Sequence, residues 1–240
     1  MRGLAGAVAL TRLPVRGAGE AAGIARSVEW FGVVGLGIGA VTGLTYWGAA
    51  GVFGPQLGAI GAVAVAVGVT GALHEDGLAD TFDALSSLRS RERQFEIMKD
   101  SRLGTFGVTA LVLVLAARVA LVSQLPVGAG AIAVLAWTHG LSRAMVVGVM
   151  LGATPATAEG SAAAHLADVR QFPAAAMALA VVGLGWWMVG DRLWLAAAAA
   201  GVAAWALRWW SYRRLGGVTG DVLGACQQAA LVAALAVVAR

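Results

Sequence analysis

The segment that decides the fold class reads FGVVGLGIGAVTGLTYWGAAGVF and runs from Phe31 to Phe53. It contains no charged residue, and about 20 apolar residues in a helix span the hydrocarbon core of a bilayer. Gly35, Gly39 and Gly43 recur at a spacing that places them on one helix face. Small residues on one face allow a second helix to approach closely. The segment therefore predicts a membrane-spanning helix with a tightly packed glycine face.

The composition of the whole chain is typical of a polytopic membrane protein. Its 240 residues are 59% hydrophobic and 12% charged, whereas about a quarter of the residues of an average globular domain are charged. The apolar segments predict an all-α protein with about seven transmembrane helices. These segments cover residues 31–53, 57–73, 103–125, 127–151, 174–189, 193–207 and 222–238. We expect a single integral-membrane domain over residues 1–240.

The basic residues are distributed unevenly among the connecting segments. They gather before residue 27, at 89–102 and at 208–214, whereas the connections near Gly54 and Pro126 carry none. Because basic loops remain in the cytoplasm, we expect the N-terminus and the loops near 74–102, 152–173 and 208–221 to be cytoplasmic. The net charge of +4 then reflects membrane topology, and we expect no nucleic-acid partner.

The most acidic run of the chain is His74-Glu75-Asp76-Gly77-Leu78-Ala79-Asp80-Thr81-Phe82-Asp83. If this run continues the second helix, Asp76, Asp80 and Asp83 lie within about 60° of one another on one face. Like charges on one face repel, and Mg²⁺ relieves such repulsion through oxygen ligands that it shares with substrate phosphates. A solvated helix end is the alternative interpretation, but it does not require three aligned aspartates.

The other polar residues of this run are less decisive. Glu75 points about 100° away from Asp76 around the helix, which makes it a weaker candidate ligand. His74 also lies off the aspartate face. A histidine at a helix end is as consistent with a structural role as with a general base.

A second polar cluster, Met98 to Gly107, precedes the third long apolar segment. It contains Lys99, Asp100, Ser101 and Arg102, and the lysine is the only one in the chain. Cationic side chains and the N-terminus of a helix both bind phosphate. A positive-inside anchor is the alternative, but it does not explain the mixed charges or the adjacent glycines. We therefore expect phosphate or metal binding here.

Two further features belong on the predicted cytoplasmic side. Arg143 lies within an apolar span, one helical turn after His139. An intramembrane arginine indicates function by default, although snorkelling explains it equally well.

A glycine-rich loop runs from Arg213 to Val222 and contains Asp221 near a helix start, where it could help to hold a phosphate or a metal. Arg118 lies nearer the outer half of its segment, and we interpret it as structural.

Aligned aspartates and phosphate-binding cations on one membrane face indicate phospho-group transfer to a hydroxyl. The physical argument predicts the reaction class and leaves the substrate open. Several segments in one order also resemble one family, cobalamin synthase, the adenosylcobinamide-GDP ribazoletransferases. They are Thr11 to Val15, the HxDGLADxxD run at 74–83, MKDSRxGTxG at 98–107 and GGxTGD at 216–221. The combination covers most of the chain and is far more specific than any one motif.

The resemblance implies a Mg²⁺-dependent reaction at a bacterial inner membrane. The phospho-cobinamide group of adenosylcobinamide-GDP is transferred to the ribose hydroxyl of α-ribazole or its 5′-phosphate, and GMP leaves. We assign His74 as a general base and Asp80 as a second catalytic residue. Phosphate binding is assigned to Lys99, Ser101, Arg102 and Arg143. The candidate metal ligands are Asp76, Asp80, Asp83, Asp100 and Asp221. Membrane lipid is an expected partner, and a homo-oligomer is left open.

The chain departs from the family pattern at two positions. Glu75 stands where an apolar residue is usual, and Gly32 stands where proline is common. The nearest alternative is a CDP-alcohol phosphotransferase, whose second aspartate motif is missing here. A transporter is the alternative from a different class, and it predicts ionisable residues near the midplane of several helices.

Overall fold

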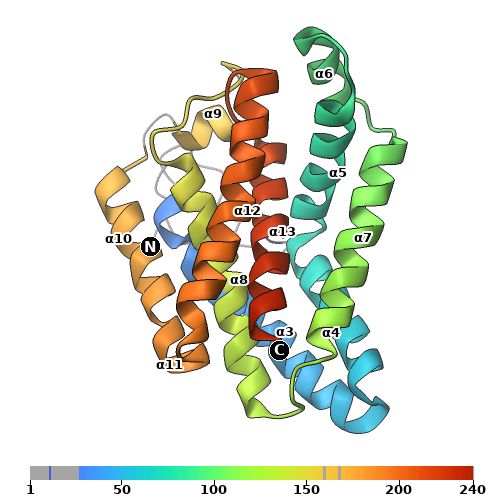
Figure 1. Ribbon diagram of the computed structural model, residues 1–240, viewed down its shortest axis with the longest axis vertical. Coiled ribbons are helices and arrows are strands. Elements are labelled where there is room, and N and C mark those ends of the chain that lie inside the picture. The colour runs from blue at the N-terminus through green and yellow to red at the C-terminus, as the bar shows by residue number, and fades with distance from the viewer. Residues whose placement is uncertain (1–10, 12–26, 159–160, 167–168, 240) are drawn as a thin grey trace.

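The computed structural model describes residues 11, 27–158, 161–166 and 169–239 (Figure 1). Every regular secondary-structure element in these ranges is a helix, so the predicted all-α fold is confirmed. The long helices stand side by side in one bundle. The elements are η1 (Val28–Trp30), α3 (Phe31–Phe53), α4 (Pro55–Thr70), α5 (Leu73–Ser86), α6 (Arg91–Met98), α7 (Thr105–Val122), α8 (Ala129–Met150), α9 (Ser161–Leu166), α10 (Gln171–Gly183), α11 (Gly185–Val189), α12 (Arg192–Leu215) and α13 (Gly220–Val238).

Five helical segments of the described chain are long and apolar enough to cross a membrane, or six if α4 and α5 form one bent span. The five are 28–53, 105–122, 129–150, 171–189 and 220–238. They overlap five of the seven apolar segments that we predicted. The count of about seven spans is not confirmed. α12 does not meet the same requirement of length and apolar character, and α4 meets it only together with α5.

The acidic run does not continue the second helix, and on this point the sequence prediction is wrong. The chain turns by 88° between α4 and α5. Gly71 and Ala72 adopt left-handed backbone conformations at the turn, with φ of 63° and 61°. Only glycine adopts this conformation without steric cost. The sequence therefore does not predict a left-handed residue at Ala72. The turn makes α5 a separate helix that packs against α7 and α13.

The predicted glycine face of α3 is confirmed as a packing surface against α8. A methyl group on Gly35 would lie 2.5 Å from the carbonyl oxygen of His139, and one on Gly43 would lie 2.5 Å from Cα of Ile132. Gly39 faces the backbone of Leu135 in the same way. Backbone contact at three successive turns fixes α3 against α8 from Ile132 to Gly140, the stretch that immediately precedes Arg143.

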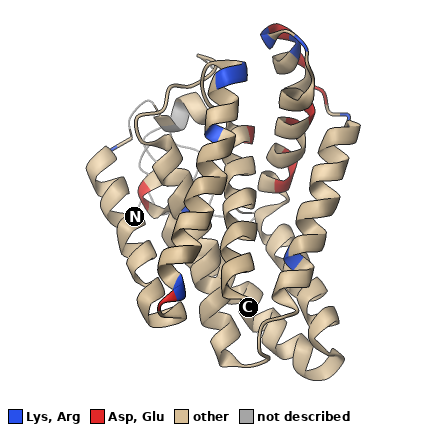
Figure 2. Ribbon diagram, in the orientation of Figure 1, with Lys and Arg blue, Asp and Glu red and all other residues tan. Residues whose placement is uncertain are grey.

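Charged residues concentrate at the end of the bundle where α6 and the C-terminal end of α12 lie, at the top of Figure 2. This end also holds the α6–α7 connection and the N-terminal end of α13. Between the two ends the surface is strongly apolar, with Val112, Leu113, Leu195 and Val202 each more than 60% exposed. Apolar surfaces of this extent are unusual on soluble monomers. The distribution is therefore that of a membrane protein with one polar end.

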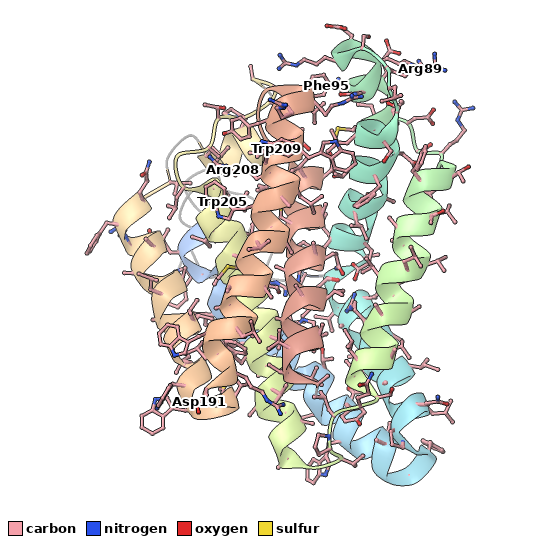
Figure 3. The ribbon with its side chains drawn as sticks, viewed as in Figure 1. Arg89, Phe95, Asp191, Trp205, Arg208 and Trp209 are labelled. Carbon is pink, nitrogen blue, oxygen red and sulfur yellow. The ribbon has the colours of Figure 1, made fainter. Side chains whose placement is uncertain are left out.

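Aromatic residues mark the two ends of α12 (Figure 3). Trp205 and Trp209 are exposed near its C-terminal end, where the Arg208 guanidinium lies 4.7 Å from the ring centroid of Trp205. Trp194 is exposed near its other end, close to Asp191. Tryptophan and arginine are typical of the boundary between lipid and water. Both ends of α12 therefore have the character of membrane boundaries.

Candidate active site

The acidic run and the glycine-rich loop, 144 residues apart at Gly77 and Asp221, meet where α5 crosses the first turn of α13. A methyl group on Gly77 would lie 2.9 Å from both Cα and the carbonyl oxygen of Asp221. One turn further along α13, a methyl group on Gly224 would lie 3.3 Å from Cα of His74. Because both glycines lack a side chain, the two backbones touch. The crossing places Asp221 beside the part of α5 that carries Asp76 and Asp80.

The start of α13 is held firmly at this crossing. The Thr219 hydroxyl accepts a hydrogen bond from the amide of Val222 at 3.2 Å, which is a side-chain N-cap. Just before it, the backbone of Val218 pairs with the segment at 154–156 through bonds of 2.9 and 3.0 Å. The Ser211 hydroxyl also donates to the carbonyl oxygen of Gly217 at 2.5 Å. These bonds give Asp221 a fixed position in the first turn.

Asp76, Asp80 and Asp221 form a cluster of negative charge, which we call the acidic cluster. Asp76 is exposed, and the other two are half-buried. The charges of Asp76 and Asp221 both act unfavourably on the charged form of Asp80. No arginine, lysine or histidine of the described residues forms an ion pair with any of the three. Uncompensated carboxylates of this kind suit a hard divalent cation.

The donor set fits Mg²⁺, although the cluster is not drawn together as a closed cage. Within the described ranges, no three acidic, histidine or cysteine side chains lie close enough together to hold an ion by themselves. Mg²⁺ is usually held by one or two carboxylates, with substrate phosphates and water supplying the remaining ligands. The acidic cluster therefore fits a metal that is completed by a phosphate-bearing substrate.

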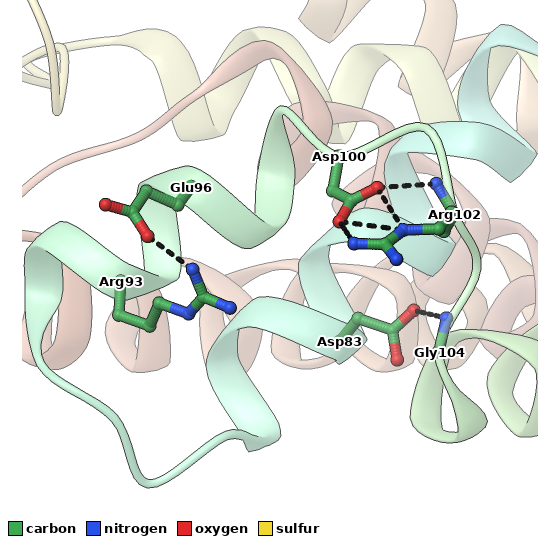
Figure 4. A network of polar contacts seen from close by, with 6 residues as sticks. All are labelled: Asp83, Arg93, Glu96, Asp100, Arg102 and Gly104. Atoms are coloured by element: carbon green, nitrogen blue, oxygen red, sulfur yellow. Dashed lines mark hydrogen bonds and ion pairs between the residues drawn. The ribbon is translucent and has the colours of Figure 1, made fainter.

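Asp83 has a different role from the other aspartates of α5. Its carboxylate accepts a hydrogen bond from the amide of Gly104 at 2.7 Å (Figure 4) and another from the amide of Gly107 at 2.8 Å. The first amides of a helix have no partner within the helix, so Asp83 caps the N-terminus of α7 from a neighbouring helix. Each of its oxygens accepts one hydrogen bond in this arrangement. Asp83 therefore positions the α6–α7 connection, and its assignment as a metal ligand stays a prediction.

The α6–α7 connection carries the four polar residues that the sequence singled out, of which Figure 4 draws Asp100 and Arg102. The Arg102 guanidinium donates to both oxygens of Asp100, at 3.0 and 2.6 Å. These bonds lower the pKa of the Asp100 carboxyl to about 2. Lys99, Ser101 and Arg102 are exposed, so they are available to a soluble anionic ligand. Asp100 is paired with Arg102, and the assignments of both residues as ligands stay predictions.

Arg143 and His74 line a cavity that reaches the acidic cluster. The cavity lies between α3, α5, α8 and α13, and Asp221 and Gly220 complete its polar edge. Arg143 is 6% exposed, so it is buried rather than snorkelling to the surface. Its guanidinium donates at 3.3 Å to the carbonyl oxygen of His139, one turn earlier in α8. The structure thus brings together His74, Arg143 and Asp221 from three helices.

Sequence reasoning missed a buried polar network beside this cavity. Glu75 accepts hydrogen bonds from Arg118 at 2.7 Å and from the amide of Gln228 at 3.0 Å. The ion pair is almost fully buried, with side chains 7% and 3% exposed. The second Glu75 oxygen and Nδ1 of His139 have no partner among the described residues, and both residues line one small polar cavity. Arg118 is the only charge in its apolar segment, which signals a buried polar contact without identifying Glu75 as the partner.

Comparison with known proteins finds relatives of one family over nearly the whole chain. The family model described as cobalamin-5-phosphate synthase matches residues 3–239. A relative from Leptothrix cholodnii, named adenosylcobinamide-GDP ribazoletransferase, is 40% identical over 87% of this chain and 82% of its own length. A relative of the same name from Bradyrhizobium diazoefficiens is 35% identical over 96% of this chain and 90% of its own. No solved structure matches the chain.

Proposed function

This chain belongs to the cobalamin-5-phosphate synthase family, and we propose that it is an adenosylcobinamide-GDP ribazoletransferase. The reaction joins the phospho-cobinamide group of adenosylcobinamide-GDP to the ribose hydroxyl of α-ribazole or its 5′-phosphate and releases GMP. The observation that carries the proposal is the crossing at Gly77 and Asp221. It gathers, at one polar end of a membrane bundle, the two motifs that carry the acidic cluster.

The residues of the site account for the steps of such a transfer. The acceptor hydroxyl oxygen forms a bond to the phosphorus attached to cobinamide, and the bond from that phosphorus to the GMP oxygen breaks. His74 lies in the cavity beside Asp221, where it can accept the proton of the attacking hydroxyl. Lys99, Ser101 and Arg102 are exposed on the α6–α7 connection, where they can bind the diphosphate of the donor.

Mg²⁺ is the proposed cofactor, and one or two of Asp76, Asp80 and Asp221 are its proposed protein ligands, with substrate phosphate and water completing the site. When bound, the ion neutralises diphosphate charge and stabilises the departing phosphate. The residues themselves contribute an uncompensated cluster of carboxylates beside the cavity. Both Asp76 and Asp221 act electrostatically on the carboxylate of Asp80.

We place the polar end of the bundle in the cytoplasm of a cell whose inner membrane the protein spans. Basic residues concentrate at this end, as expected for cytoplasmic loops. We further propose that α12 is a seventh span beside the bent α4–α5 pair and the five apolar helices. Its 24 residues extend about 36 Å at 1.5 Å per residue, and exposed tryptophans mark both of its ends.

The buried polar network does not favour a transporter. A transporter predicts a polar pathway near the midplane, and Glu75, Arg118, His139 and Arg143 do lie within the bundle. However, the cavity that they line has a volume of only about 10 Å³, which is the space that about one water requires. The network is a polar contact between helices that leaves no room for a solute to pass.

The proposed function is tested with purified protein in liposomes. Adenosylcobinamide-GDP, α-ribazole 5′-phosphate and Mg²⁺ are supplied together, and GMP and the corrinoid product are measured. We expect GMP release that requires both substrates and stops when the metal is chelated. Absence of GMP release with all three components present, or release that is independent of the ribazole acceptor, would contradict the proposal.

A further inference from the structure

The cavity beside the acidic cluster has an apolar wall whose role the reaction does not yet explain. Phe31, Val34 and Ile38 form the wall on the α3 side, and they share one face at intervals of three and four residues. Val146 and Met150 line it from α8. The polar groups of the cavity are confined to His74, Arg143 and the start of α13. It therefore has an apolar interior and one polar edge, the pattern of a site for a small ligand.

The size of the cavity limits what it can hold. Its volume is about 90 Å³, several times the roughly 10–15 Å³ that one ordered water needs by the same measure. A bicyclic aromatic ring is of this order of size, whereas a corrin ring is far larger. The cavity therefore suits the base of one of the two nucleotide parts of the substrates.

The apolar wall discriminates between those two bases. Guanine carries a carbonyl and amino groups on its ring edges, and these would be left unpaired against Phe31, Val34, Ile38 and Met150. Burying polar groups without hydrogen-bond partners is unfavourable. The benzimidazole of ribazole carries methyl groups at the corresponding edge and no exocyclic polar group. The wall therefore favours the acceptor base over the donor base.

Arg143 supplies the polar anchor. Its guanidinium is buried and donates a hydrogen bond to the carbonyl oxygen of His139. No carboxylate of the described residues forms an ion pair with it, and Glu75, which influences it electrostatically, is already paired with Arg118. A buried cation without a paired anion is costly. An anionic group on the ligand, such as the 5′-phosphate of the acceptor, would relieve this cost.

We propose that this cavity is the acceptor subsite. The benzimidazole base packs against Phe31, Val34 and Met150, the 5′-phosphate binds Arg143, and the ribose hydroxyl faces His74 and Asp221. The inference rests on the proposed function, because it names where one substrate of that reaction binds. In this arrangement α3 and α8 hold the acceptor, whereas the α6–α7 connection holds the diphosphate of the donor.

The test measures equilibrium binding to the full-length protein in lipid nanodiscs. Val146→Phe fills the cavity, and we expect it to raise the Kd for α-ribazole 5′-phosphate about tenfold or more while the Kd for adenosylcobinamide-GDP stays unchanged. The matched control is Val134→Phe, which makes the same change in a separate cavity lined by Leu125, Val134 and Val189. It should alter neither Kd. If Val146→Phe does not fold, Val34→Phe fills the same cavity from the opposite wall.

A second pair of variants tests the anchor. Arg143→Met should weaken α-ribazole 5′-phosphate more than unphosphorylated α-ribazole, and Arg143→Lys should restore part of the difference because it retains the charge. Unchanged ribazole affinity in the cavity-filling variants, as expected if a lipid chain occupies the cavity, would overturn the inference. If ribazole affinity is unchanged in those variants but the wild-type protein still releases GMP, the proposed function stands and only the subsite is ruled out. Cavity-dependent ribazole binding without any GMP release would overturn the proposed function and leave the subsite standing.

Discussion

At the scale of single residues, the carboxylates of α5 face three different environments. Asp76 and Asp80 face Asp221 without a compensating cation, Asp83 binds the amides of Gly104 and Gly107, and Glu75 is buried against Arg118. Helical spacing explains why Glu75 departs from the aspartate face, since it lies about 100° from Asp76. The carboxylates of this short run therefore have three different roles. Asp76 and Asp80 serve the chemistry, Asp83 positions the α6–α7 connection, and Glu75 packs in the core.

Asp83→Asn tests the positioning role. The neutral amide weakens the two bonds to Gly104 and Gly107, and hydrogen bonds to a charged group contribute about 1.5–3 kcal/mol. We expect amide hydrogen exchange at Gly104 and Gly107 to become about tenfold faster or more. Amides in the middle of α7, which are bonded within the helix, serve as the internal control. Unchanged exchange at both glycines would show that Asp83 does not hold the connection.

Glu75→Ala tests the buried ion pair. It leaves Arg118 buried without its partner, and breaking a buried pair in this way costs about 3–5 kcal/mol. We expect a corresponding loss in the free energy of unfolding, measured by thermal unfolding or by titration with a denaturing detergent. The double variant Glu75→Leu with Arg118→Met should recover most of that loss, because a buried ion pair can be replaced by apolar residues. A loss of less than about 0.5 kcal/mol in Glu75→Ala would contradict a structural role for the pair.

At the scale of elements, the site depends on a crossing of two helices without intervening side chains. Gly77 of α5 touches the backbone of Asp221, and Gly224 of α13 faces the backbone of His74. The glycines of α3 produce the same close approach to α8. Small residues therefore determine how near the acidic cluster, His74 and Arg143 come to one another.

Gly77→Ala tests the crossing. The added methyl group would lie 2.9 Å from two backbone atoms of Asp221, which cannot move without shifting α13. We expect the rate of GMP release to fall about tenfold or more. The matched control is Gly68→Ala in α4, where the methyl group meets no atom within 4 Å and the helix should gain about 0.5–1 kcal/mol. Equal activity of Gly77→Ala and the wild type would contradict a requirement for this contact.

The sequence predicts part of the site and misses the rest for identifiable reasons. Spacing correctly assigns Gly35, Gly39 and Gly43 to one packing face. It cannot reveal the turn at Ala72, because alanine gives no signal for a left-handed conformation. Nor can it pair Glu75 with Arg118, since the two residues are 43 positions apart. Local periodicity therefore predicts faces, whereas contacts between distant helices require the fold.

At the scale of the whole molecule, the bundle has one polar end and an apolar girdle. The charged residues gather near α6 and the C-terminal end of α12, and exposed apolar side chains cover the middle of α7 and α12. A membrane around the girdle leaves the polar end, with the acidic cluster, facing one aqueous compartment. A large, water-soluble nucleotide substrate can then reach the site from that compartment alone.

Single-cysteine labelling tests this topology. Cys226 is buried and is the only cysteine of the chain, so the unmodified protein should not react with a membrane-impermeant maleimide. Gln124→Cys lies in the exposed α7–α8 connection, and Ser90→Cys lies in the exposed segment before α6. In intact spheroplasts we expect only Gln124→Cys to react, whereas Ser90→Cys should react after the membrane is permeabilised. Labelling of Ser90→Cys in intact cells would reverse the proposed orientation.

The central claim is that the acidic cluster at the α5–α13 crossing is the reaction centre. It is tested most directly by the rate of GMP release from adenosylcobinamide-GDP by Asp80→Asn in lipid nanodiscs, with α-ribazole 5′-phosphate and Mg²⁺ present. Glu92→Gln, which makes the same carboxylate-to-amide change on the exposed surface of α6, is the matched control. The account predicts a rate reduced about 100-fold or more in Asp80→Asn, with unchanged thermal stability, and an unchanged rate in Glu92→Gln. A wild-type rate in Asp80→Asn would contradict it.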